Sequence, residues 1–276
     1  MNLVFKKLHI NAILIMLALL ITATSSAQQT QTRGSSDEQK KGFDISARSN
    51  RTDNGFISSE VQVTMVLKNA AGQQSSRKME FITLEVTDED KGDKSLVIFN
   101  TPKDVEGTAL LSHAKILDPD DQWLFLPALK RVKRISSKNK SGPFVGSEFA
   151  FEDFTSTELN KYDYLWLRQE ACGDMICDVI ERKPRYKYSG YKKQIAWIDQ
   201  KDIQLRKIEF YNRRDSLLKT LTLEDYRQYG SIWRAHKLHM LNHSNGKSTD
   251  LIYDNYQFKV GLTDNDFVKG RLAELR

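Results

Sequence analysis

The sequence predicts a mainly β (α+β) protein in which about eleven or twelve antiparallel strands lie between a helix near each end of the chain. Three observations support this fold class. Only 39% of the 276 residues are apolar, below the roughly 45–50% of an average globular domain. Short runs rich in threonine, tyrosine, phenylalanine and valine alternate with a period of two, as in half-buried strands. Brief polar turns separate these runs, which favours an antiparallel meander.

Residues 1–27 have the pattern of a secretory signal peptide. Lys6 and Lys7 precede an apolar stretch at 12–21, which is about half the length that a helix needs to cross a bilayer. Small side chains at Ser25 and Ala27 suit a signal peptidase, so we expect cleavage after Ala27 and a periplasmic protein. An uncleaved anchor is the alternative.

The mature chain is predicted to begin with a disordered leader at 28–40, followed by one domain at 41–276. Ser36 is a suitable N-cap for a first helix that runs to about Asn50. A single domain of this length can bury a large core when it is a barrel or a sandwich.

Period-two alternation predicts six strands in the first half of the chain. Val61, Val63 and Met65, for example, alternate with polar or smaller residues. The expected strands cover 60–66, 79–86, 95–100, 107–117, 123–126 and 132–135. The acidic turn at 118–121 lacks the staggered ligands and the bidentate glutamate of a calcium loop, so no calcium site is expected there.

Phe144, Phe149, Phe151 and Phe154 crowd into an otherwise irregular segment. Irregular surface segments are usually polar, so this one is expected either to fold back as a plug over a core or to form an exposed contact for an apolar ligand. Ordinary core packing of a strand through Phe149 and Phe151 is the other interpretation.

The second half predicts a run of hairpins, with strands at 163–172, 177–182, 192–199, 205–212, 217–226, 233–241 and 249–260. Cys172 and Cys177 flank a Gly-Asp turn in one of these hairpins. Because an exported protein meets an oxidising compartment, we predict a disulfide between them, with free or metal-binding thiols as the alternative.

Thr263 or Asp264 can cap a last helix that carries Phe267, Val268 and Leu272. Strands and terminal helices of this kind can form a closed barrel, a two-sheet sandwich, or one strongly curved sheet whose concave side holds the helices.

The residues do not predict catalysis, so we expect no enzyme and no cofactor. The run at 145–149 lacks the second glycine of a nucleophile elbow, and no phosphate-binding loop occurs. His236, His239 and His243 could bind a metal only on a helix; on a strand, His236 and His239 lie on opposite faces, so solvent-facing histidines and no metal are expected.

A basic tract at Lys130, Arg131, Lys133 and Arg134 is the sharpest charge feature of a chain with formal net charge +6. Nucleic acid is not an expected partner, since export separates the protein from it. Contact with anionic lipid headgroups or with an acidic partner is the functional interpretation, and a solvated strand edge protected by lysines is the alternative.

The stretch from Gly107 to Phe154 resembles the outer-membrane lipoprotein-sorting, LolA-like family. The resemblance is carried by Gly107-Thr108-Ala109-Leu110-Leu111, by Trp123 to Ile135 with its Leu-Pro-Ala-Leu-Lys-Arg-Val-Lys-Arg core, and by Phe144-Val145-Gly146-Ser147-Glu148-Phe149 with Glu152-Asp153. More loosely, it extends through the hairpins to the last helix.

The resemblance implies an incomplete antiparallel β-barrel whose concave side, lidded by the N- and C-terminal helices, shelters acyl chains. The expected function is therefore a periplasmic carrier of lipoprotein acyl chains or of another lipid, with an inner-membrane lipid exporter as a partner and peripheral contact with anionic membrane. The alternative is an accessory module that docks on an envelope transporter through 144–154 and holds no lipid. The candidate lining residues are Met65, Phe81, Phe99, Leu110, Trp123, Phe125, Phe149, Phe151, Trp197 and Phe210.

Overall fold

A computed structural model describes residues 36–88, 91–156 and 158–274. The predicted signal peptide, its cleavage site and most of the predicted leader lie outside these residues. Within them, one α-helix covers 36–51, close to the helix expected up to Asn50. Residues 36–40, which we expected to belong to a disordered leader, are helical, and a Lys40–Asp44 ion pair of 2.7 Å lies one turn apart on this helix.

All thirteen strands among the described residues belong to one antiparallel sheet, in the order β6-β5-β4-β3-β2-β1-β13-β12-β11-β10-β9-β8-β7. The prediction of a mainly β antiparallel fold is confirmed, with one or two strands more than the eleven or twelve expected from the sequence. The strands are β1 Ser58–Lys68, β2 Gln74–Leu84, β3 Lys91–Thr101, β4 Ala109–Lys115, β5 Asp121–Leu126, β6 Arg131–Arg134, β7 Tyr162–Cys172, β8 Met175–Pro184, β9 Tyr191–Asp199, β10 Leu205–Asn212, β11 Leu217–Tyr229, β12 Ile232–Asn242 and β13 Ser248–Phe258.

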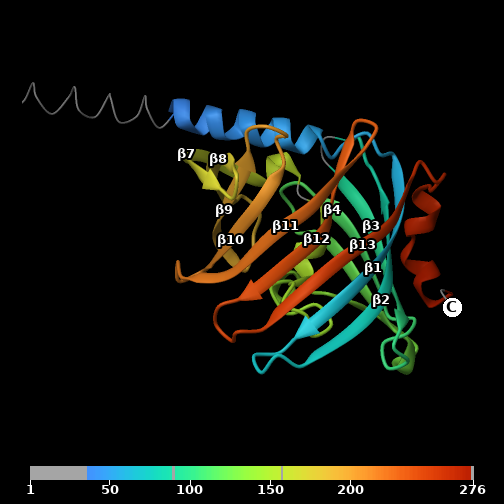
Figure 1. Ribbon diagram of the computed structural model, residues 1–276. Coiled ribbons are helices and arrows are strands. Elements are labelled where there is room, and N and C mark those ends of the chain that lie inside the picture. Colours follow the sequence, from blue (N-terminus) through green and yellow to red (C-terminus); the bar gives the residue numbers. More distant parts are fainter. Residues whose placement is uncertain (1–35, 89–90, 157, 275–276) are drawn as a thin grey trace, which may run out of the picture.

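The sheet is strongly curved but is not closed, because β6 and β7 are its two edges and do not pair with each other. The N-terminal helix lies across one open end, beside β7 to β10 (Figure 1). Gly42 allows this close approach, since a Cβ there would stand 2.7 Å from the backbone nitrogen of Trp166 in β7. Lys41 also places its ammonium 3.3 Å from the Trp166 ring centroid.

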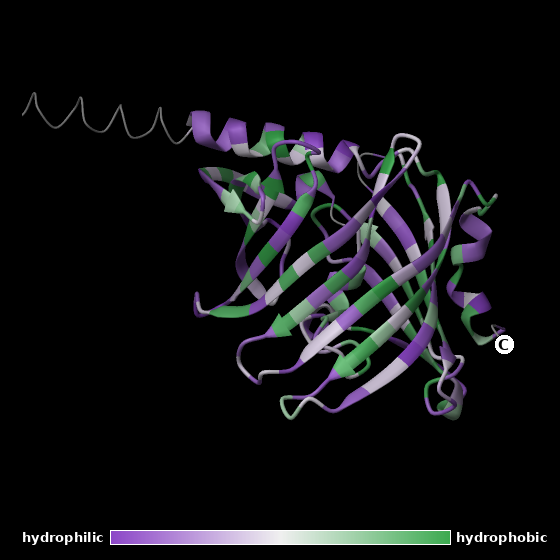
Figure 2. Cartoon of the chain, viewed as in Figure 1, coloured by the Kyte–Doolittle hydropathy of each residue, from purple (hydrophilic) through white to green (hydrophobic). Residues whose placement is uncertain are grey.

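Apolar side chains alternate with polar ones along most strands (Figure 2), and the two faces of the sheet form separate cores. On the concave face, residues of β1 to β4 and of β10 to β13 form one large cluster that includes Met65, Phe99 and Leu110. On the convex face, Leu96, Leu111 and neighbouring residues form a second cluster.

The C-terminal segment lies against the convex face and not the concave face that we predicted. It forms two 3-10 helices, η5 Asp264–Phe267 and η6 Lys269–Ala273, which Figure 1 shows outside the curved sheet. The expected cap is present, because Thr263 and Asp266 bond reciprocally. Phe267 and Leu272 are buried in the convex cluster. The two 3-10 helices therefore cover apolar side chains of β2 to β5 that would otherwise be exposed to solvent.

The phenylalanine-rich segment folds back into the concave side as a plug, one of the interpretations that the sequence left open. Phe144, Phe149 and Phe154 are buried, and the Phe144 and Phe154 rings stand 4.2 Å apart. We call residues 140–156 the plug. It contains η3 Phe151–Phe154; the other short 3-10 helices are η1 Pro127–Leu129, η2 Ser137–Asn139 and η4 Leu159–Lys161.

Candidate functional site

A cavity of about 440 Å³ lies between the concave face of the sheet, the N-terminal helix and the plug. Its volume falls in the range of known small-molecule sites, roughly 300–1,000 Å³. A second cavity of about 210 Å³ lies deeper along the same face. Phe149, Arg182, Leu205, Leu223 and Leu238 line both cavities, so we treat the two as parts of one site, the trough.

The trough is lined by both polar and apolar residues, and its apolar part comes from concave-face residues that successive strands present to it. Val61, Phe81 and Leu251 come from β1, β2 and β13. Ile208 and Met240 come from β10 and β12 and line the smaller cavity. This continuous apolar surface can remove acyl methylenes from water, each worth about 0.8 kcal/mol.

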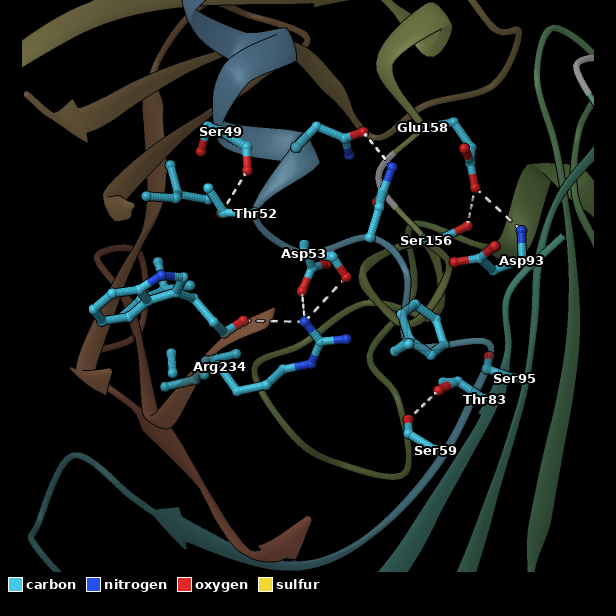
Figure 3. Close-up of a pocket in the computed structure, with 18 of the residues that line it drawn as sticks. Ser49, Thr52, Asp53, Ser59, Thr83, Asp93, Ser95, Ser156, Glu158 and Arg234 are labelled. Carbon is cyan, nitrogen blue, oxygen red and sulfur yellow. Dashed lines mark hydrogen bonds and ion pairs between the residues drawn. The ribbon is translucent and has the colours of Figure 1, made fainter. Parts of the chain in front are cut away.

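One end of the larger cavity is polar, where the N-terminal helix meets β1, β2 and β3 (Figure 3). Glu85, which follows β2, accepts hydrogen bonds from the backbone N–H of Gly55 at 2.8 Å and of Ile57 at 2.9 Å. This carboxylate therefore fixes the connection between the helix and β1. Ile57 adopts a left-handed φ of 62° there, which is unusual for a β-branched residue.

Two further carboxylates, those of Asp93 and Glu158, lie at this end of the cavity. Glu158 accepts a hydrogen bond from the Asp93 backbone N–H at 3.1 Å and another from Ser156, and Figure 3 shows the three residues together. Burial raises the pKa of Asp93 to about 7, and the charge of Glu158 adds to the rise, whereas the Val86 N–H bond lowers it. Asp93 therefore gains and loses a proton near neutral pH.

Arg234 of β12 points toward Asp53, just after the helix (Figure 3), and forms an ion pair with it. Arg234 also lies over Phe56, with its guanidinium carbon 5.1 Å from the ring centroid. The pair ties the end of the helix to the far side of the sheet. The Ser59 and Thr83 hydroxyls, which join β1 to β2, complete the polar end.

Buried ion pairs fasten the plug to the sheet. Lys219 contacts Asp153 at 3.3 Å and donates to the Glu148 carbonyl at 2.9 Å, while the Tyr191 hydroxyl bonds the same Asp153. Glu152 points elsewhere, accepting bonds from Ser189 and Gly190. Glu152 and Asp153 are neighbours in the 3-10 helix η3 and not in an extended run, and since their carboxylates bond to different partners, they do not form an acid/base pair.

The structure brings only some of the predicted lining residues to the trough. Phe81 lines the larger cavity, Phe210 the smaller one and Phe149 both. Met65, Phe99, Leu110 and Phe151 face or pack against the concave core but line neither cavity, because the plug covers that part of the face.

The prediction that Trp123, Phe125 and Trp197 line the trough is wrong, because all three belong to the convex face. Trp123 and Phe125 of β5 pack with the cluster that η5 and η6 cover. Trp197 of β9 packs with Cys177 and Val179, whereas its neighbour Ile198 lines the trough. Adjacent residues of a strand point to opposite faces of the sheet. An error of one residue in the predicted alternation therefore assigned these side chains to the concave face, whereas they lie on the convex face.

The basic tract lies on an edge strand and lines neither cavity. Lys130, Arg131, Lys133 and Arg134 are exposed on and beside β6, and Arg134 is ion-paired with Asp121. The tract is therefore free to meet a surface outside the trough, and its role in headgroup or partner contact stays a prediction.

Two predictions for the second half of the chain, the disulfide and the exposure of the histidines, have different outcomes. The Cys172–Cys177 disulfide is confirmed, and it closes the β7–β8 hairpin. The expectation of solvent-facing histidines is wrong for His236, which is buried with bonds to Tyr229 and to the Tyr253 carbonyl. Among the described residues, no cluster of His, Cys, Asp and Glu could hold a metal ion.

Sequence reasoning missed the charged residues of the trough, above all Arg182, Asp93 and Arg234. Arg182 and Arg234 lie in strands that were predicted, whereas Asp93 of β3 precedes the strand predicted at 95–100; all three were assigned by default to solvent. The one sign in the sequence that such a residue faces inward is its position in the alternation of the strand. Arg182 lies two residues from Ile180 and therefore on the same face, and Ile180 is fully buried.

Comparison with other proteins gives a consistent assignment. A family model described as "Uncharacterized protein" matches residues 91–274, and no curated protein matches the chain. The crystal structure of an outer-membrane lipoprotein-sorting protein domain from Vibrio parahaemolyticus is 48% identical, with 85% of this chain and 99% of that chain covered and a TM-score of 0.82. A DUF1329 family protein from Desulfovibrio piger is 26% identical over 85% and 99% of the chains, with a TM-score of 0.80.

A LolA superfamily protein from Nitrosomonas europaea shares the fold at 21% identity, with 83% of this chain and 98% of that chain covered and a TM-score of 0.69. Within the described part of the chain, no helix combines the length and the apolar character that crossing a bilayer requires. The open curved sheet and these similarities confirm the resemblance found in the sequence. This chain belongs to the outer-membrane lipoprotein-sorting protein family, with a LolA-like fold.

Proposed function

We propose that this protein is a periplasmic carrier that binds the acyl chains of a lipoprotein, or of another lipid, in the trough and moves that lipid across the envelope. The observation that carries the proposal is the trough itself, about 440 Å³ with a neighbouring 210 Å³, on the concave face. Its apolar walls suit acyl chains, and its polar end suits the group that follows them. The protein acts by binding and not by catalysis.

The N-terminal helix is the element that can cover the cargo. It lies across the open end of the sheet and contributes Ser46, Ser49 and Asn50 to the wall of the larger cavity. It contacts β7 through Gly42, through the Lys41–Trp166 cation–π pair, and through Phe43 and Ile45, which pack against Tyr164. A lipid can therefore enter or leave by displacement of this helix without disruption of the sheet.

The partners in this proposal follow from the outer surface. An inner-membrane lipid exporter would deliver the cargo, and the exposed basic tract would attract the anionic membrane surface, where each Lys or Arg contributes about 1 kcal/mol. The alternative of a docking module that uses the segment at 144–154 is not favoured, because Phe144, Phe149 and Phe154 are buried inside the fold.

The proposal is tested by filling the trough. Leu223→Trp in β11 places an indole where both cavities meet, so binding of a fluorescent fatty acid should weaken by about tenfold or more. Leu217→Trp in the same strand is the matched control, since Leu217 is 38% exposed and lines neither cavity. Thermal unfolding of both variants checks that the fold is retained.

Native cargo provides the second measurement. Mature protein purified from a periplasm without detergent should yield stoichiometric lipid or acylated peptide in organic extracts analysed by mass spectrometry. Clean extracts together with no uptake of the fluorescent fatty acid would refute the carrier and favour the docking module.

A further inference from the structure

A buried arginine lies where the two cavities of the trough meet. Arg182 is in β8, is 7% exposed and lines both cavities. The sheet register places it opposite Tyr164 of β7 and Gln194 of β9. Arginine is a permanent cation in proteins, so a full positive charge lies where the two cavities meet.

The protein holds this guanidinium in place but does not neutralise it. Nη2 donates to the Gln194 side-chain oxygen at 2.7 Å, and the guanidinium carbon lies 5.5 Å from the Tyr162 ring centroid. Nε has no hydrogen-bond partner in the part of the chain that the structure describes. Within the described residues, no carboxylate comes within ion-pair distance of Arg182.

Lys161 and Arg234, the other cations that line the trough, are paired, and so is Lys219, which fastens the plug; the buried Lys140 of the plug instead donates to the Asp120 carbonyl. Lys161 contacts Asp120 at 2.8 Å and Lys219 contacts Asp153 at 3.3 Å, and each of these lysines is about as buried as Arg182. Arg234 pairs with Asp53. A buried charge without a counterion loses several kcal/mol of hydration, so the exceptional state of Arg182 points to a counterion that the chain itself does not supply.

A second donor without a partner lies on the wall of the larger cavity. The Ser46 hydroxyl on the N-terminal helix is buried and has no hydrogen-bond partner among the described residues. Its neighbour Ile45 packs in the same cluster as Tyr164, the residue opposite Arg182 in the sheet. Two residues that line the larger cavity, one in the sheet and one in the N-terminal helix, thus each carry a buried donor without a partner among the described residues.

We propose that Arg182 is the anion-binding residue of the trough and that it holds the carboxylate or phosphate oxygens of the acyl lipid carried there. This inference rests on the proposed carrier function and narrows its cargo to lipids with an acidic headgroup. Guanidinium groups match both oxyanions, because two parallel N–H groups meet two oxygens. The apolar walls then receive the chain that follows the acidic group.

The carboxylates of the trough do not oppose such a ligand strongly. Asp153 is offset by Lys219, and Glu85 is occupied by two backbone N–H groups. Asp93 and Glu152 each have a pKa raised to about 7, mainly by burial. Both are therefore partly protonated at neutral pH.

The test compares an acid with its neutral ester. Palmitate and methyl palmitate compete for the trough against a neutral fluorescent acyl probe, and the wild-type protein should prefer palmitate by about tenfold to a hundredfold, the range of a charge-assisted hydrogen bond. Arg182→Gln should reduce this preference to near one, and Arg182→Lys should retain part of it. The control is Arg168→Gln in β7, an exposed arginine paired with Glu170 that lines neither cavity.

Further ligands identify the oxyanion and its source. Lysophosphatidic acid tests the phosphate, while acetate and inorganic phosphate test the anion without a chain. Stronger competition by palmitate or by lysophosphatidic acid than by the free anions, lost in Arg182→Gln, supports the proposal. Competition by inorganic phosphate equal to that by lysophosphatidic acid would overturn a lipid ligand.

The two proposals fail in different ways. Equal binding of palmitate and methyl palmitate by the wild type, with Arg182→Gln unchanged, would overturn the role of Arg182 and leave the carrier intact. Binding of neither ligand would overturn the carrier itself. Circular dichroism melting of each variant separates loss of binding from loss of fold, and Arg182→Lys supplies a charged variant if the glutamine variant does not fold.

Discussion

Replacing Asp93 by asparagine should make the protein more stable at pH 8 and leave its stability at pH 4 nearly unchanged. Burial raises the pKa of Asp93 to about 7 in the folded protein, whereas the unfolded chain has a value near 3.9. At a pH between these two pKa values, Asp93 keeps its proton in the folded state and has lost it in the unfolded state. The contribution of Asp93 to stability is therefore complete below about pH 4 and is lost as the pH rises toward 7.

The size of the effect follows from the difference between the two pKa values. Each unit corresponds to about 1.4 kcal/mol, so a rise from about 3.9 to about 7 corresponds to about 4 kcal/mol. This figure is an upper bound, because water and neighbouring groups relax around the charged carboxylate. Asparagine stays neutral and keeps an oxygen that can accept the Val86 N–H bond, which is 2.9 Å long in the wild type.

Urea denaturation of the wild type and of Asp93→Asn between pH 4 and pH 8 measures this difference. We expect the free energy of unfolding of the variant to equal that of the wild type at pH 4. At pH 8 it should be higher by about 2–4 kcal/mol. Asp174→Asn, in the exposed turn between β7 and β8, controls for the loss of one surface carboxylate. A difference for Asp93→Asn that stays constant or falls with pH would refute the reasoning.

The other predictions concern the plug and the basic tract. Phe144→Ala should lower the free energy of unfolding by about 3–5 kcal/mol, because Phe144 is fully buried against Phe154. The control Leu129→Ala, at a residue 67% exposed, should change it by less than about 0.5 kcal/mol. Equal urea midpoints for the two variants would contradict the role of Phe144 in the plug. Serine at the four basic positions of 130–134 should weaken binding to anionic liposomes about a hundredfold at low salt, since three of them lack a carboxylate partner in the described structure; unchanged cosedimentation would remove the electrostatic role.

Most of the fold could be predicted from the sequence because each strand carries its own evidence. Alternation and polar turns identified all thirteen strand regions, and the hairpin turn with its two cysteines identified the disulfide. These features depend on residues close together in the chain. Curvature and the choice of face depend on distant partners, which explains why the C-terminal helices were placed on the wrong side of the sheet.

The candidate site was predicted less well because alternation gives two sets of residues without saying which set faces inward. Phe125 and Leu110 lie on adjacent strands, and both are apolar and buried, yet Phe125 meets the C-terminal helices while Leu110 meets the concave core. A sheet covered on both faces has no solvent-facing side to reveal its parity. The error at β5 and β9 is therefore a consequence of the outer clusters.

The charged residues of the concave side divide into two groups by their partners. Asp120 with Lys161 joins segments 41 residues apart on either side of the plug. Asp153 with Lys219 joins the plug to β11 across 66 residues, so this pair sets where the plug lies and thereby how much of the concave face stays open. Among residues 36–88, 91–156 and 158–274, Arg182 joins nothing that would need its charge, because its only side-chain hydrogen bond there is to a neutral amide on the adjacent strand. A neutral residue of similar shape would serve the fold as well, so the charge itself is better explained by a ligand than by stability.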